Sequence, residues 1–143
     1  MTAVPPGFSH IGIAVPDLEA AVAHWQAVLG VAAGPVLRNE AQGVQMQRFD
    51  LAGAQIELLS PLGDRGPLAG YLTRNPRGGL HHLAFASTDL EADLARLLQL
   101  GVVPIGQPGR NVMGQRMVFL QPASMQGLLI ELQEADAAVT DGG

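Results

Sequence analysis

At two places along the chain, the spacing of hydrophobic and polar residues changes from a strand-like to a helix-like pattern. A stretch with the character of a β-strand is followed by apolar residues at the spacing of one helix face. The sequence therefore predicts strands over 8–15 and 80–87, followed by helices over 18–29 and 90–100. An aspartate stands at each expected helix N-cap and a glycine follows each helix end: Asp17, Asp89, Gly30 and Gly101.

Three further strands are expected in each half, which gives the pattern βαβββ twice and an α+β fold. They lie near 35–39, 44–51 and 54–60, and near 102–105, 115–121 and 127–133. A short helix over 67–74 is expected between the halves. We predict one domain over residues 1–143, with module one at about 8–62, a connector at about 63–78, module two at about 79–133 and a frayed tail over 134–143.

The two halves also match residue by residue. The run that begins at His10 and passes through Asp17 recurs from His82 through Asp89, at a constant spacing of 72 residues. Gln-Ile-Glu-Leu around Glu57 recurs as Leu-Ile-Glu-Leu around Glu131, at a spacing of 74. Several such matches in one order indicate two copies of one module of about 70 residues, which is how repeated architectures are recognised.

The composition narrows the function classes. The chain has 143 residues, of which 48% are hydrophobic, and its net charge is -5. It contains no cysteine and all eight basic residues are arginine, which excludes disulfides, thiol chemistry and lysine Schiff bases. The acidic balance argues against nucleic acid as a partner, and no apolar run is long enough for a membrane helix. The first residues lack the features of a secretory signal, so we expect a cytoplasmic enzyme or binding domain.

Four residues at equivalent repeat positions are candidates for chemistry. His10 and His82 open the first strand of their halves, and Glu57 and Glu131 lie within apolar runs on the last strands. Burying an unpaired carboxylate in such a run costs on the order of several kcal/mol, unless a cation or a metal ion compensates it. Each of these residues alone would be interpreted as an ordinary core or surface residue, whereas their shared positions favour a metal site.

Strand alternation places the two carboxylates on a face of their own. Glu57 points away from Ile56 and Leu58, and the same holds for Glu131 and its neighbours, so the acidic face differs from the face that packs on a helix. Two imidazoles and two carboxylates suit a divalent cation that takes nitrogen and oxygen ligands: Co, Zn, Ni, Mn or Fe. Such a site leaves one or two positions for water or a substrate.

Five motifs surround these residues: His10-Ile-Gly-Ile-Ala-Val-Pro-Asp17, Gln42-Gly-Val44, Ile56-Glu-Leu-Leu-Ser-Pro-Leu62, Gly78-Gly-Leu-His-His-Leu-Ala-Phe85 and Gly127-Leu-Leu-Ile-Glu-Leu132. Together they resemble the vicinal oxygen chelate superfamily, which includes glyoxalase I, extradiol dioxygenases and methylmalonyl-CoA epimerases. The resemblance covers about residues 8–133 and is greatest to the epimerase branch. It implies paired βαβββ modules that form a curled, half-barrel mixed sheet around a metal ion.

The resemblance also implies a function. The two His and two Glu named above match the family's metal ligands, with the second residue of the His81–His82 pair as the ligand. The implied activity is that of an isomerase, a metal-dependent epimerase of methylmalonyl-CoA-like 2-acyl thioesters that abstracts the α-proton through a metal-stabilised enolate. Glu131 is the candidate for one catalytic base. Glu40 is the candidate for the second, with an ordinary loop carboxylate as the alternative interpretation.

Two motifs depart from the epimerase pattern. Gln45-Met46-Gln47 carries no carboxylate where some members have one, and Gln121-Pro122-Ala123-Ser124 stands where the family often has His-Pro-Lys-Ser. The candidates for substrate binding are Ser124, together with Arg116 in the Gly109–Arg116 loop, where Arg110 is a further cation. An acyl-CoA thioester is the expected substrate, and the absent lysine removes one cation that could meet a CoA phosphate.

Other functions remain open at this stage. A glyoxalase I-like lactoylglutathione lyase, or another isomerase of the superfamily, would use the same ligands. A ring-cleaving dioxygenase is less favoured, because Glu57 fills a position that oxygen chemistry needs open. A small-molecule binding or resistance protein is the non-enzymatic alternative. A symmetric homodimer is the ordinary expectation, with the site completed either within one chain or across two.

Overall fold

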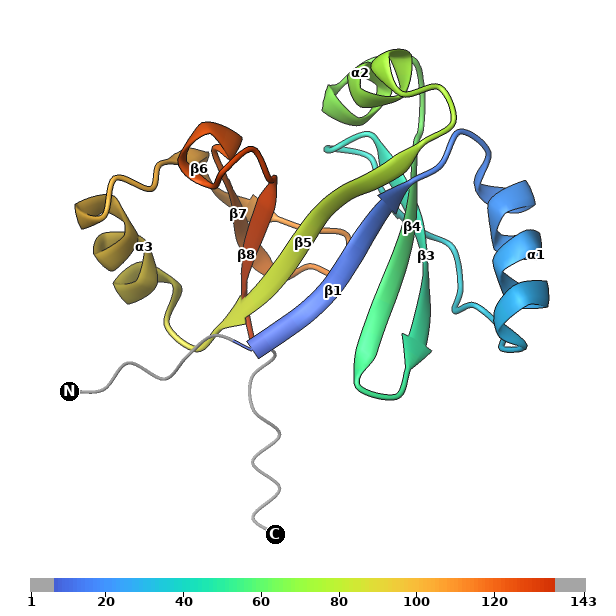
Figure 1. The fold of residues 1–143 in the computed structure, drawn as a ribbon, viewed down its shortest axis with the longest axis horizontal. Coiled ribbons are helices and arrows are strands. Elements are labelled where there is room, and N and C mark those ends of the chain that lie inside the picture. Colours follow the sequence, from blue (N-terminus) through green and yellow to red (C-terminus); the bar gives the residue numbers. More distant parts are fainter. Residues whose placement is uncertain (1–6, 136–143) are drawn as a thin grey trace, which may run out of the picture. The chain divides into compact units, whose positions relative to one another are not determined.

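The computed structural model describes residues 7–135, and its elements follow the predicted order. The first module contains β1 (Gly7–Ala14), α1 (Leu18–Leu29), β2 (Leu37–Asn39), β3 (Val44–Leu51) and β4 (Ala54–Pro61). A connecting helix, α2 (Pro67–Arg74), follows. The second module contains β5 (Gly79–Ser87), α3 (Leu90–Gln99), β6 (Pro104–Arg110), β7 (Arg116–Leu120), a 3-10 turn (Pro122–Ser124) and β8 (Ile130–Glu134). The expected βαβββ pattern is present twice (Figure 1).

The two long helices begin and end where the sequence predicts. The side chain of Asp17 accepts a hydrogen bond from the Ala20 amide, and that of Asp89 accepts one from the Ala92 amide. Gly30, at the end of α1, has a positive φ of 72°, a conformation that glycine adopts without steric cost. These caps satisfy amide groups that the first turn of a helix leaves without partners. Within residues 7–135, no helix has the length and apolar character to cross a membrane.

Two strands of the second module differ from the predicted bounds. The strand expected over 102–105 occupies Pro104–Arg110, with a register irregularity between Ile105 and Gly109. The strand expected over 127–133 starts three residues later and ends at Glu134, inside the predicted tail, whose residues 136–143 lie outside the described residues. Gln126 and Gly127 both have positive φ, so this segment forms a turn before the strand begins.

The described chain divides into two compact units. One unit, here called the N-terminal unit, comprises His10–His82, and the other, the C-terminal unit, contains the remaining described residues. The division falls within β1 and within β5, so the unit boundaries are not the predicted module boundaries. The single domain expected from the sequence stays a prediction.

The strands of module one hydrogen-bond in the order β2-β3-β4-β1, in a mixed sheet. β1 and β4 are parallel and the other pairs are antiparallel, with Gly12 opposite Glu57. Phe49 and Leu58 are fully buried and form a core with Val22 of α1, so the helix covers the face opposite Glu57. The carboxylate face and the helix-packed face therefore differ, as strand alternation predicts.

Module two repeats this arrangement with the order β5-β8-β7-β6. β5 and β8 are parallel, with Ala84 opposite Glu131. Leu132 and Val118 pack with Leu90 of α3 on the other face of the strands. Each module thus has one helix-covered face, and the glutamate of its last strand lies on the other.

Candidate metal site

Three of the four predicted ligands lie in the N-terminal unit. His10 shares its face of β1 with Gly12, and the parallel register places Gly12 opposite Glu57 of β4. His82 is the last residue of the unit and lies on β5. His10, Glu57 and His82 are 3%, 6% and 7% exposed, so all three polar side chains are buried.

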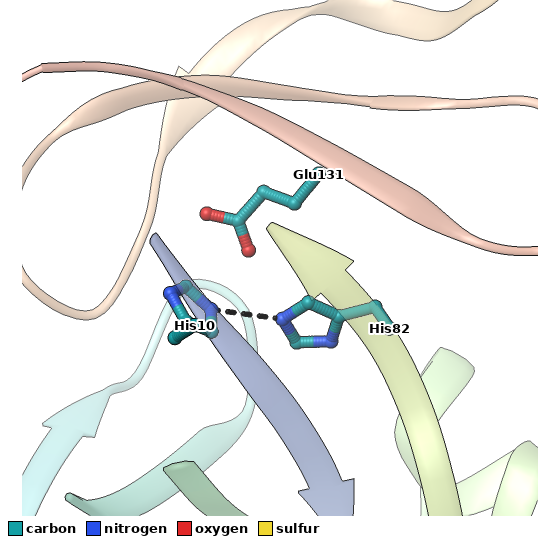
Figure 2. A group of neighbouring side chains, drawn as sticks. All are labelled: His10, His82 and Glu131. Carbon is teal, nitrogen blue, oxygen red and sulfur yellow. Dashed lines mark hydrogen bonds between the residues drawn. The ribbon is translucent and has the colours of Figure 1, made fainter. Parts of the chain in front are cut away.

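His10 contacts both other residues through one ring nitrogen. His10 Nε2 lies 3.2 Å from Glu57 Oε1. It lies 3.1 Å from His82 Nε2, a contact drawn as a dashed line in Figure 2. The two imidazole rings meet edge to face, with centroids 5.2 Å apart. Nε2 of His10 thus lies within hydrogen-bond distance of one buried carboxylate and of a second imidazole.

This set of donor atoms fits a divalent cation. Two ligand atoms at about 2.0–2.1 Å from one tetrahedral metal lie about 3.3 Å apart. The two separations from His10 Nε2, 3.2 Å to Glu57 and 3.1 Å to His82, are close to that value. Neutral imidazole and carboxylate are ligands that Zn, Co, Ni, Mn and Fe accept. A bound cation would also compensate the burial of the Glu57 carboxylate. His10 and His82 are therefore residues of this unit that could hold a metal ion, and Glu57 is the carboxylate that contacts His10.

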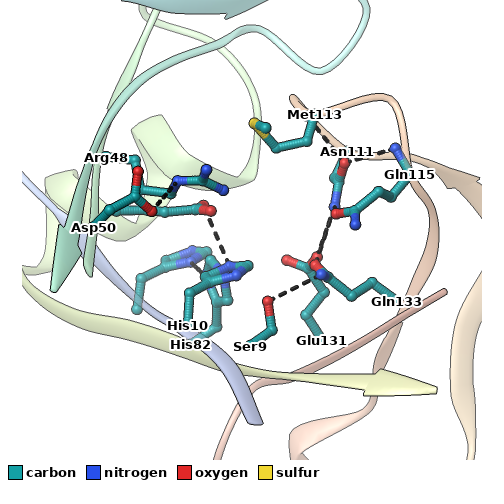
Figure 3. Close-up of polar contacts among 12 residues, drawn as sticks. Ser9, His10, Arg48, Asp50, His82, Asn111, Met113, Gln115, Glu131 and Gln133 are labelled. Carbon is teal, nitrogen blue, oxygen red and sulfur yellow. Dashed lines mark hydrogen bonds and ion pairs between the residues drawn. The ribbon is translucent and has the colours of Figure 1, made fainter. Parts of the chain in front are cut away.

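The fourth predicted ligand, Glu131, lies in the C-terminal unit and is 3% exposed. Its Oε2 accepts a hydrogen bond from Nδ2 of Asn111 at 3.2 Å (Figure 3). The same Asn111 nitrogen lies 3.2 Å from the side-chain oxygens of Gln115 and Gln133, and its Oδ1 accepts from the amides of Met113 and Gln115. Asn111 therefore holds both the turn between β6 and β7 and the carboxylate of Glu131.

Glu40, the predicted second base, lies in the turn that follows β2. Its side chain is 78% exposed and its carboxylate is 3.7 Å from Nε of Arg38. The structure does not gather it with the buried ligands of its own unit. Water surrounds most of this carboxylate, which makes it accessible to solvent protons.

The two predicted substrate contacts already have partners in the C-terminal unit. Arg116 forms ion pairs with Glu91 and Glu134, and hydrogen bonds to these carboxylates raise the pKa of Arg116 above its ordinary value. It lines an open pocket of about 320 Å³ together with these two acids. The hydroxyl of Ser124 donates to the carbonyl of Gln121 and accepts from the amide of Val103.

The sequence did not indicate two polar residues beside the predicted ligands, Arg48 and Asn111, whereas His81 was expected as a neighbour of His82. Arg48 of β3 lies directly opposite Glu57 in the antiparallel register and pairs with Asp50 at 3.1 Å. Asn111 bonds Glu131, as described above, and His81 contacts His82 through a ring nitrogen. Only the register of β3 against β4 could have indicated Arg48, because an alternating strand gives no pairing partner by itself.

Comparisons with known proteins agree with this geometry. A profile of the glyoxalase/bleomycin resistance protein/dioxygenase superfamily matches residues 9–119. The ethylmalonyl-CoA/methylmalonyl-CoA epimerase of Cereibacter sphaeroides is 39% identical over 128 residues, which cover 88% of this chain and 96% of that protein.

Solved structures show the same likeness. The methylmalonyl-CoA epimerase of Mycobacterium tuberculosis matches with a TM-score of 0.84 and 31% identity, over 94% of this chain and 91% of that one. A methylmalonyl-CoA epimerase solved in complex with methylmalonyl-CoA and NH4+ matches with a TM-score of 0.83 and 33% identity, over 94% and 97%. The predicted α+β fold of two βαβββ modules is thereby confirmed.

Proposed function

Because the chain belongs to the glyoxalase/bleomycin resistance protein/dioxygenase superfamily, we propose that it is a metal-dependent epimerase of methylmalonyl-CoA-like 2-acyl thioesters. The observation that carries the proposal is the buried group of His10, Glu57 and His82, whose donor atoms lie 3.1 and 3.2 Å apart in pairs around His10. Relatives named as epimerases of this substrate, 31–39% identical over most of the chain, support the activity.

We assign Glu131 as the fourth ligand. It occupies the repeat position of Glu57, lies on the equivalent strand and is likewise buried. When bound, a divalent cation would supply Lewis-acid polarisation of the substrate oxygens and would stabilise the negative charge of the enolate. The chain's own groups then have to bind the thioester and move the α-proton.

Glu131 is the group we propose for proton abstraction. Its Oε2 accepts a hydrogen bond from the neutral side-chain amide of Asn111, which holds the carboxylate in place. A carboxylate placed beside the α-carbon contributes about 10²- to 10⁴-fold as a general base. Return of the proton to the opposite face requires a second donor, and Glu40, with water around it, is the candidate for that step.

Arg116 and Ser124 remain the proposed contacts for the anionic part of an acyl-CoA thioester. Arg116 stays protonated at any working pH, because its two carboxylate partners raise its pKa. Contact with a substrate phosphate or carboxylate would replace one of these partners. The partly exposed side chain of Arg116, at 34%, leaves room for that exchange.

The experiment that tests the function follows deuterium entering the substrate. The purified full chain is incubated with methylmalonyl-CoA in D₂O, with added Co²⁺ or with EDTA, and the α-proton is observed by NMR. We expect exchange and epimerisation with Co²⁺ and neither with EDTA. Bound metal without exchange would reject the epimerase and would favour the glyoxalase I-like lyase, which turnover of a glutathione hemithioacetal would then establish.

A homodimer and a cytoplasmic location, both expected from the sequence, complete the proposal. A dimer is the commonest assembly of small enzymes, because a two-fold axis closes the interface. Light scattering coupled to gel filtration at micromolar concentration tests the oligomer directly. A monomeric mass would reject the dimer and leave the proposed chemistry untouched.

A further inference from the structure

We infer that His81 is a positioning residue, which selects the tautomer of His82 whose Nε2 lone pair can bind the metal ion. Nδ1 of His81 lies 2.9 Å from Nδ1 of His82, while Nε2 of His82 lies 3.1 Å from Nε2 of His10. The two nitrogens of the His82 ring therefore have separate roles, one toward His81 and one toward the site. All these residues belong to the N-terminal unit.

The argument rests on the donor inventory of imidazole. A neutral ring carries one N–H donor and one acceptor nitrogen. A metal ion takes the lone pair of Nε2, so the proton of a ligating His82 must reside on Nδ1. That proton then points at Nδ1 of His81, which accepts it. Metal-binding histidines are commonly oriented by such an acceptor, and its loss typically costs about 10- to 100-fold in metal affinity.

His81 is itself fixed by the connecting helix. The ring of Tyr71, on α2, meets the His81 ring edge to face with centroids 5.2 Å apart. The Tyr71 hydroxyl donates to the carbonyl of Leu80 at 2.9 Å, which ties the helix to the strand next to His81. A side chain at Gly79 would bring a Cβ within 3.0 Å of that hydroxyl, in a backbone conformation with φ of 153°.

Gly12 completes the support from the other side. A Cβ built on Gly12 would lie 2.2 Å from Cε1 and 2.5 Å from Nδ1 of His82, so the ring occupies the space that any side chain there would need. A Cβ added at Gly78 would lie 2.1 Å from the carbonyl oxygen of Ala14, so this position also has no room for a side chain. The Gly-Gly-Leu-His-His motif thus has one physical explanation: its glycines permit the close approach, and its first histidine orients the second.

The inference rests on the proposed metal site but not on the epimerase activity, so its test measures metal binding and tautomer. Co²⁺ affinity of the full chain is measured by competition with a chelator, with the visible absorption of bound Co²⁺ as the signal. We expect His81→Phe to lower the affinity about 10- to 100-fold. His81→Asn should restore most of it, because the amide oxygen of Asn takes nearly the place of Nδ1 as an acceptor.

The tautomer of His82 can also be measured in the wild-type protein, without any substitution. The ¹⁵N resonances of His82 in the metal-free protein should show the proton on Nδ1. The matched control is His24→Phe on the exposed surface of α1, which should leave Co²⁺ affinity unchanged. Equal Co²⁺ affinity of His81→Phe and wild type, equal losses in the Phe and Asn variants, or a His82 proton on Nε2 would each overturn the inference. An absence of epimerisation with normal Co²⁺ binding would reject only the proposed function.

Discussion

Glu57 and Glu131 occupy equivalent positions in the two modules, yet their immediate partners differ in kind. The Glu57 carboxylate lies 3.2 Å from an imidazole nitrogen of His10, and the residue opposite it on the parallel strand is Gly12. The Glu131 carboxylate accepts from the side-chain amide of Asn111, and the residue opposite it is Ala84. Glu57 thus contacts another candidate ligand, whereas Glu131 accepts a hydrogen bond from an amide that also holds a turn.

The different partners of the two glutamates suit two different tasks, metal coordination and proton transfer. A carboxylate bonded to a fellow ligand is held for coordination, since moving it would disrupt both. A hydrogen bond from a neutral amide to a carboxylate contributes on the order of 1.5–3 kcal/mol, and for Glu131 the amide donor lies on a turn. We therefore assign coordination to Glu57 and proton transfer, in addition to coordination, to Glu131.

The largest effect is expected for Glu131→Gln, which keeps the size of the side chain and removes its basicity. Exchange of the substrate α-proton in D₂O should fall by about 10²- to 10⁴-fold, the usual contribution of a general base. Co²⁺ affinity should change much less, because the amide oxygen remains a possible ligand. A variant that exchanges the α-proton at the wild-type rate would remove Glu131 from the mechanism.

Glu57→Ala should give the opposite pattern. Loss of a direct ligand is expected to lower Co²⁺ affinity at least about 100-fold, beyond what loss of a supporting partner costs. Saturating Co²⁺ should then restore a substantial part of the proton exchange, because the base is intact. If saturating metal restores nothing, the division of tasks between the two glutamates is wrong.

Gly12→Ala and Ala84→Gly compare the positions opposite the two carboxylates. The added methyl at Gly12 would overlap the His82 ring, so we expect about 10- to 100-fold weaker Co²⁺ binding, as for other lost supports. Ala84→Gly should leave Co²⁺ affinity near wild type and lower the stability by about 0.5–1 kcal/mol, the usual cost of glycine within a strand. Thermal unfolding of the metal-free proteins measures that cost, and equal affinities of both variants would contradict the role of Gly12.

Asn111→Asp tests the support of Glu131 without removing the turn. Asp keeps the oxygen that accepts from the Met113 and Gln115 amides, but it loses the donor and places a like charge near Glu131. We expect kcat to fall about tenfold, in line with the loss of one hydrogen bond to a charged group. Steady-state kinetics at saturating metal measures this, and an unchanged kcat would show that Glu131 needs no such partner.

The smallest effect is expected for Glu40→Gln. The Glu40 carboxylate is 78% exposed, so water can replace it as a proton donor, and we expect only about a two- to fivefold fall in epimerisation. Exchange of the α-proton on the face served by Glu131 should be unaffected. The informative quantity is therefore the ratio of the epimerisation rate to this exchange rate. A ratio equal to that of wild type would show that Glu40 is an ordinary loop carboxylate with no part in proton transfer.

The sequence predicted the elements whose signals are local. The N-cap aspartates, Asp17 and Asp89, each bond an amide three residues ahead, so they mark a helix start regardless of the rest of the chain. The symmetric positions of the His and Glu residues likewise needed only the repeat. The face of Glu57 followed from strand alternation, and the buried core around Leu58 confirms it.

The sequence did not predict features that depend on pairing between distant segments. Arg48 lies opposite Glu57 only because of the register of β3 against β4, and Asn111 meets Glu131 across 20 residues. The start of β8 was placed too early, because nothing in the apolar run around Leu128 shows that Gln126 and Gly127 turn the chain. Hydrophobic pattern defines a face, whereas side-chain partners depend on the three-dimensional fold.

Three of the four proposed ligands lie in one unit, which has a consequence for how such a chain can diversify. Of the proposed ligands, His10, Glu57 and His82 would keep part of their affinity for a cation while the residues around Glu131 change. Mutations in the turn that carries Asn111 can therefore alter the reaction before they abolish the metal.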